Sequence, residues 1–79
     1  MLEIRECRKA AKLSQYELAR RTGFSRMRLS LVECGYVALR PDEDRTLRAA
    51  ITSAVRERVA HFQDQLGGQM QARNLNPQP

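Results

Sequence analysis

The chain has few of the residues that hold metals, form disulfides or carry out catalysis. Its 79 residues contain one histidine, two cysteines and no tryptophan. Cys7 and Cys34 lie far apart, without the CxxC or paired-histidine spacing of a metal site. The sequence also lacks a phosphate-binding loop, and no serine has the neighbouring histidine and aspartate that would activate it as a nucleophile. We therefore expect no enzyme, no metal, no cofactor and no small-molecule ligand.

Long hydrophobic runs and aromatic side chains are scarce as well. No window approaches the ~18 uninterrupted apolar residues of a membrane span, and the N-terminus lacks the apolar segment of a signal peptide. We therefore expect a cytoplasmic protein with no membrane partner. Aromatic residues make up 5% of the chain, so leucine, isoleucine, valine and alanine must fill its core. A chain of this length allows one small domain.

Positive charge is concentrated in the first half of the sequence. The formal net charge is +5, and residues 1–40 contain nine Lys/Arg against four Asp/Glu. Residues 41–79 contain five of each. A basic surface of this kind favours a polyanionic partner such as double-stranded DNA, and an ordinary solvated surface is the alternative.

The segment from Leu13 to Gly35 has the features of two short helices joined by a tight turn. Ser14 stands three residues before Glu17, which is the spacing of a capping box. Gly23 can take the positive φ that ends the first helix, and Ser25 is placed to cap the second. The facing apolar sides consist of Leu18, Ala19, Leu29 and Val32. The pattern predicts a helix-turn-helix with helices over about 15–22 and 26–34, a geometry that fits the major groove of DNA.

These residues resemble the helix-turn-helix family of phage repressors and Cro proteins, which includes small bacterial regulators of restriction–modification operons. The matching residues, between Leu2 and about Ile51, are Ile4, Cys7, Arg8, Leu13, Ser14, Gln15, Glu17, Leu18, Ala19, Gly23, Phe24, Ser25, Leu29, Val32, Glu33 and Gly35. The resemblance implies an all-α fold, a compact bundle of four or five helices, that binds operator DNA as a symmetric dimer. It also implies a bacterial or phage-encoded protein that is associated with the nucleoid when bound.

The first helix is expected over about residues 2–11, with Ile4 and Cys7 on its inward face. Cys7 falls where the family usually has leucine, so we expect a reduced thiol in the core. Lys12 stands where the family commonly has glycine. A left-handed conformation there would cost of order 1 kcal/mol, and a different end to the helix is the alternative.

Base contacts are expected on the outward face of the second motif helix. The candidates are Arg26, Met27, Arg28, Ser30 and Leu31. The resemblance supplies these positions except Ser30, which helical geometry places on the same face. An arginine can donate two hydrogen bonds to guanine, whereas Met27 and Leu31 can pack against thymine methyl groups. Leu31 often has a polar counterpart in the family, so a protein-interaction module, such as an antitoxin or an anti-activator, is the alternative function.

Phosphate contacts are expected around this helix. The resemblance places the side chain and amide of Gln15 near a phosphate, at a helix N-terminus that favours anions. The other candidates are Arg21, Ser25, Tyr36, Arg40, Arg5 and Arg20, and any of them can instead be an ordinary solvated side chain. The resemblance also pairs Arg8 with Glu33. We expect this pair to orient the helices, since an exposed pair contributes only ~0–1 kcal/mol.

The sequence of the C-terminal half predicts one long helix. Pro41 is suited to open it, and no glycine or proline follows between Asp42 and Leu66. A break near Thr52 and Ser53 is the alternative. We expect Gly67 and Gly68 to end the helix, so that residues 1–66 form the domain and residues 67–79 a disordered tail.

Two apolar stripes lie about 90° apart around this helix. The first consists of Leu47, Ala50, Ile51 and Ala54 and should pack on the domain's own core. The second consists of Val55, Val59, Phe62 and Leu66, and we assign it to the same helix of a partner subunit. Folding back on its own bundle is the alternative. The sequence therefore predicts a homodimeric, sequence-specific regulator of transcription that binds an inverted repeat with half-sites ~34 Å apart.

Overall fold

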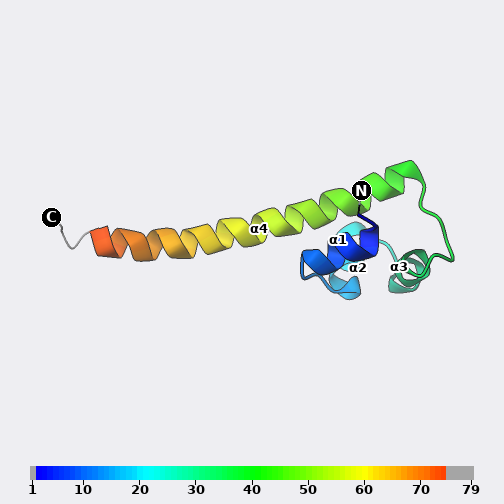
Figure 1. The fold of residues 1–79 in the computed structure, drawn as a ribbon, viewed down its shortest axis with the longest axis horizontal. Helices are drawn as coiled ribbons and strands as arrows, with labels where there is room; N and C mark the ends of the chain where they lie inside the picture. Colours follow the sequence, from blue (N-terminus) through cyan, green and yellow to red (C-terminus); the bar gives the residue numbers. More distant parts are fainter. Residues whose placement is uncertain (1, 75–79) are drawn as a thin grey trace.

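The computed structural model describes residues 2–74, with the side chains of residues 2–67, and contains four helices. They are α1 (Ile4–Ala10), α2 (Gln15–Thr22), α3 (Arg26–Glu33) and α4 (Pro41–Asn74). The described residues form no strand, which confirms the all-α prediction. Helices α1 and α2 pack on the first half of α4, α3 packs on α2, and the rest of α4 extends away from them as a rod (Figure 1).

Local signals in the sequence set most of the helix boundaries. The hydroxyl of Ser14 accepts a 3.0 Å hydrogen bond from the amide of Glu17, and Ser25 accepts one of 3.0 Å from Arg28. The second half of the predicted capping box is wrong, because the Glu17 carboxylate turns to arginines of its own helix. A reciprocal box forms at the start of α1 instead, between Glu3 and Glu6.

The turn after α1 uses a residue other than glycine. Lys12 has φ 61°, the left-handed conformation that costs of order 1 kcal/mol, and α1 ends at Ala10. Arg58, far along α4, donates hydrogen bonds to the carbonyls of Ala11 and Lys12, the latter over 2.8 Å. These carbonyls have no partner within α1, so Arg58 stabilises this turn while holding α1 against α4.

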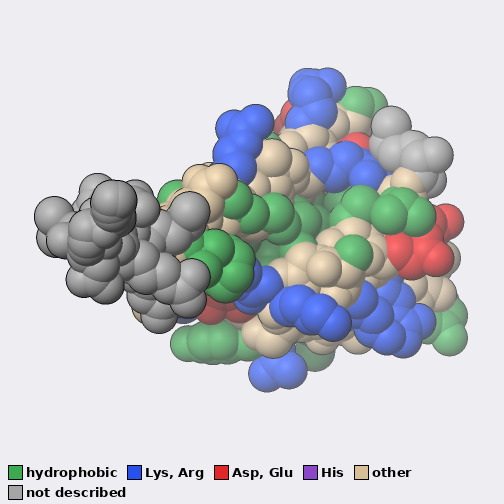
Figure 2. All heavy atoms as spheres, turned by 60° about the vertical axis from the view of Figure 1, so that its left-hand side comes forward, with side chains coloured by type: hydrophobic (Ala, Val, Ile, Leu, Met, Phe, Trp, Pro, Cys, Tyr) green, Lys and Arg blue, Asp and Glu red, His purple; other side chains and the backbone are tan. Residues whose placement is uncertain are grey.

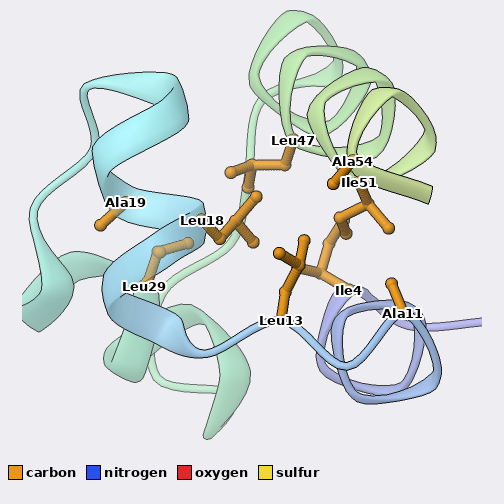
Figure 3. Close-up of a cluster of buried hydrophobic side chains, with 9 residues drawn as sticks. All are labelled: Ile4, Ala11, Leu13, Leu18, Ala19, Leu29, Leu47, Ile51 and Ala54. Carbon is orange, nitrogen blue, oxygen red and sulfur yellow. The ribbon is translucent and has the colours of Figure 1, made fainter. Parts of the chain in front are cut away.

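The core lies where the two motif helices, α1 and the first stripe of α4 meet (Figure 3). Leu18, Leu29 and Leu47 are completely buried, one from each of α2, α3 and α4. The first stripe packs inward as predicted, with Ile51 and Ala54 buried and Ala50 partly buried against the same cluster. Cys7 is half-buried against this core, and Cys34 is exposed.

Ala19 of α2 is buried in the core cluster, with 7% of its surface exposed. We expect Ala19→Leu to lower the free energy of unfolding by ~1–3 kcal/mol, because a larger side chain overpacks a well-filled core. Thermal or urea unfolding monitored by circular dichroism measures the change. The matched control is Ala49→Leu, because Ala49 is exposed on α4. Equal stability of Ala19→Leu and wild type would contradict the tight contact of α2 with its neighbours.

Helix α4 is longer than the sequence led us to expect. It runs without a break through Thr52 and Ser53, and it continues through Gly67 and Gly68 to Asn74. The predicted helix end at Gly67 is therefore wrong, as is the assignment of residues 67–74 to a disordered tail. A glycine weakens a helix interior by about 1 kcal/mol without breaking the helix. The first proline after Gly67 and Gly68 is Pro77. Residues 75–79 of the predicted tail lie outside the described residues.

No helix in the described part of the chain is both long enough and apolar enough to span a membrane.

A buried ion pair connects α1 to the end of α3. The guanidinium of Arg8 donates to both carboxylate oxygens of Glu33, over 2.7 and 2.9 Å, and to the carbonyl of Leu13 over 2.8 Å. The two charged side chains are only 10% and 3% exposed. The pair itself was predicted, but treating it as an exposed contact was wrong, because loop residue Leu13 and α2 close over it.

Candidate nucleic-acid interface

The outward face of α3 carries three exposed side chains, Arg26, Met27 and Leu31, of the five that we predicted as base contacts. Leu29 turns inward and is fully buried, whereas Met27 is 75% exposed and Leu31 is 39% exposed. Arg26 is exposed in the first turn, and Ser30 is half-buried. Arg26 has no ion-pair partner among the described side chains. The face therefore combines one unpaired guanidinium with two apolar side chains.

Arg28 does not offer a free guanidinium on this face, because it forms an ion pair with Glu43. Its guanidinium makes two parallel hydrogen bonds to Glu43, of 2.7 and 2.9 Å, and its central carbon lies 5.3 Å from the centre of the Phe24 ring. The hydrogen bonds from Arg28, and then the one from the Arg40 amide, lower the pKa of Glu43 to about 2. The carboxylate is thus ionised at neutral pH, and Arg28 connects α3 to the first turn of α4.

Two candidate phosphate contacts are likewise bound to carboxylates. The side-chain amide of Gln15 donates to Glu33 over 3.1 Å. Arg21 donates to Glu17 over 2.9 Å and makes two further hydrogen bonds to Glu57, of 2.9 and 3.1 Å. The pair with Glu57 joins α2 to α4 across 36 residues of sequence. A phosphate would have to compete with these carboxylates for both side chains.

The other phosphate candidates all lie at the surface, with Arg5 on α1 and Arg20 on α2. Ser25 caps the start of α3, where unpaired backbone amides favour an anion. Tyr36 is 80% exposed in the connection that follows α3. Arg40, just before α4, is also exposed and reaches Asp42 at 3.5 Å. In Figure 2, Lys and Arg side chains lie on both sides of a run of hydrophobic side chains on one face of the molecule.

Three residues that fix this interface were missed by the sequence analysis. Glu43 and Glu57 hold Arg28 and Arg21, and Arg58 holds the turn after α1. Glu43 belongs to an acidic cluster, Asp42 to Asp44, in the first turn of α4, where negative charge is also favourable for the helix itself. The signal available for Glu43 was its negative charge, which could neutralise one of the arginines of the helix-turn-helix.

The arrangement of α2 and α3 can be compared with known proteins. The family described as helix-turn-helix matches residues 4–43, which is half of the chain. No curated protein and no solved structure matched it. The members of this family are generally regulators and not enzymes. The match covers α1, both motif helices and the start of α4, so it includes the face described above. The chain therefore belongs to the helix-turn-helix family of Cro/CI-type repressors and is a DNA-binding regulator.

Proposed function

We propose that this protein is a sequence-specific transcriptional regulator that binds an inverted-repeat operator in the cytoplasm as a homodimer. The observation that carries the proposal is the exposed face of α3. Arg26, Met27 and Leu31 project from a helix whose two ends are fixed by buried or bidentate ion pairs. A helix held in this way can present its side chains to base edges at a defined angle, which sequence-specific reading requires.

The homodimer is proposed from the second stripe of α4. Val55, Val59, Phe62 and Leu66 are between 39% and 60% exposed, so the stripe does not fold back on its own bundle. The intervals of four, three and four residues are those of a coiled-coil seam. A shallow, mostly apolar groove between α1 and α4 adjoins the stripe at Val55. The groove is lined by Leu2, Cys7, Ala10, Ala11, Ile51, Thr52, Val55 and Arg56.

A second copy of the same helix is the partner that fits this stripe best. The seam is continuous over about 17 Å of helix, and a two-fold axis would place each apolar residue against another. Burying a side chain such as Phe62 contributes ~1.5–3 kcal/mol. Dimerisation would also bring two copies of α3 onto one DNA, as an inverted repeat requires.

Replacing Arg26 with alanine tests the assignment of α3. We expect a loss of ~1–3 kcal/mol on an operator selected from random DNA, with relaxed preference at one base pair in each half-site, because arginine reads guanine through two hydrogen bonds. Titration of labelled duplexes at fixed salt measures both quantities. Arg45→Ala is the control, since it removes the same charge from an exposed position on α4. Arg45 lies about 160° around α4 from Glu43, which is the residue that pairs with α3.

Equal losses on selected and random DNA would reduce Arg26 to a phosphate contact. If selection returns no preferred sequence, the operator proposal fails. The protein-interaction alternative predicts an apolar interface that changes little with salt, whereas DNA binding through phosphates must weaken steeply as salt is raised.

A further inference from the structure

We propose that Met27 and Leu31 read the 5-methyl groups of pyrimidines in each half-site, beside the guanine contact of Arg26, and that Glu43 preserves this apolar contact by holding Arg28 away from the bases. The inference rests on the proposed operator binding. It defines the kind of base that α3 recognises, and it assigns Glu43 as a positioning residue that acts through Arg28.

The first step is the spacing of the two apolar side chains. Met27 and Leu31 are four residues apart on α3, and both are exposed. Four residues of helix rise about 6 Å along the axis, compared with 3.4 Å between successive base pairs. In the major groove they would therefore meet base pairs one or two steps apart.

The second step is the chemistry that such side chains can recognise. Neither Met27 nor Leu31 offers a hydrogen bond that could replace water at a base edge. The only apolar feature in the major groove is the 5-methyl group of thymine, and cytosine gains the same group when it is methylated. Apolar side chains on this face therefore favour a 5-methylpyrimidine over cytosine or a purine.

The third step is the absence of a competing donor at Arg28. Its guanidinium is engaged with both oxygens of Glu43 and lies over Phe24. Arg26 is therefore the only arginine of α3 that is not in an ion pair, and Ser30 is half-buried. If Arg28 were released, a second guanidinium could bind guanine or a phosphate beside the apolar pair. The pair with Glu43 thus prevents a second guanidinium from competing with the two apolar side chains.

A protein partner fits this pair less well than DNA. A protein interface of standard size buries about 800 Å² and some 20 residues on each partner. Met27 and Leu31 are two side chains beside the charged Arg26, and the nearby Arg28 is paired. Two methyl groups, in contrast, need no larger apolar surface than these side chains provide.

The test replaces thymine by deoxyuridine at one position at a time in an operator selected with the wild-type protein. We expect two positions in each half-site at which the loss of the methyl group weakens binding by about fourfold, or about fifteenfold when it is lost from both half-sites. A second comparison, of cytosine with 5-methylcytosine at the same position and both paired with guanine, adds the methyl group without changing the hydrogen-bonding pattern of the base pair. Uracil at positions outside the half-sites should have no effect and serves as the control.

Variants of the protein separate the two parts of the proposal. Met27→Ser and Leu31→Ser should each lose the weakening of binding that uracil causes at one position. The comparison uses variants whose melting curves match that of the wild type. Glu43→Gln should release Arg28, reduce the uracil effect and add a preference for guanine in the selected site. Asp44→Asn removes the same charge from the same turn of α4 without touching Arg28, because Asp44 pairs with Arg48, and should leave the selected site unchanged.

Three results would overturn the inference. If binding is indifferent to uracil at every position of a selected operator, the methyl readout is wrong and the proposed operator binding stands. If Glu43→Gln selects the same site as the wild type, the role of Glu43 is wrong. If no operator can be selected at all, the proposed function fails and this inference fails with it.

Discussion

Replacing Phe62 with aspartate is expected to convert the protein into a folded monomer that loses most of its operator affinity. Phe62 is 60% exposed at the centre of the α4 stripe, and a charge there cannot be buried against a second copy without a large desolvation cost. The fold should survive, because Leu47 and Ile51 hold α4 on the core. Weak, salt-sensitive binding should remain, since each monomer still carries one copy of α3.

Sedimentation at micromolar concentration, together with DNA titration, measures this prediction. His61→Asp is the matched control, because it adds the same side chain one residue away on the same helix, about 130° from the stripe. That control should remain dimeric and bind its operator normally. If the wild type sediments as a monomer at this concentration and Phe62→Asp binds DNA undiminished, the dimer proposal fails.

Replacing Arg8 with methionine is expected to cost ~3–5 kcal/mol of folding free energy, because it leaves the carboxylate of Glu33 buried without its partner. A domain of this size has roughly 4–12 kcal/mol of total stability, so the variant should be close to unfolding at room temperature. Urea unfolding at pH 7 is the measurement. The double variant Arg8→Met with Glu33→Met should recover most of the lost free energy of unfolding. If the double variant is as unstable as Arg8→Met, packing rather than charge is responsible.

The same pair makes stability depend on pH. Burial by itself would raise the pKa of Glu33, but the hydrogen bonds from Arg8 and Gln15 outweigh it, and the pKa is lowered. The stabilisation is therefore present above the ordinary glutamate pKa of about 4.3 and is lost as the pH falls through the lower value in the folded state. Urea unfolding of the wild type between pH 7 and 3 should show this loss, and the double methionine variant should lack the contribution. The same slope in both proteins would assign the effect to other carboxylates.

Residues close together in sequence made the helix-turn-helix predictable. Ser14 and Ser25 cap helices within three residues of themselves, and Gly23 ends α2 with φ 81°. These signals depend on one turn of backbone, so they act in the same way wherever the helix lies in the fold. The apolar period of α4 was local in the same sense, and it identified the stripe that packs inward and the one that stays exposed.

Only the tertiary structure decided which long side chains are available to DNA. Arg21 and Arg28 resemble Arg26 in sequence, but Glu57 and Glu43 bind them from α4, 36 and 15 residues away. Arg58 reaches the end of α1 across 46 residues, and it offsets part of the cost at Lys12. The end of α4 was also misjudged, because two glycines lower helix stability without forbidding the helix. A guanidinium on a flexible stem can reach any carboxylate within several ångströms, and the packing of distant helices determines which carboxylate lies there. The sequence by itself therefore determined the helices of the motif, their serine caps and their apolar faces, whereas the choice of ion-pair partners, and with it the composition of the proposed DNA-facing surface, came from the fold.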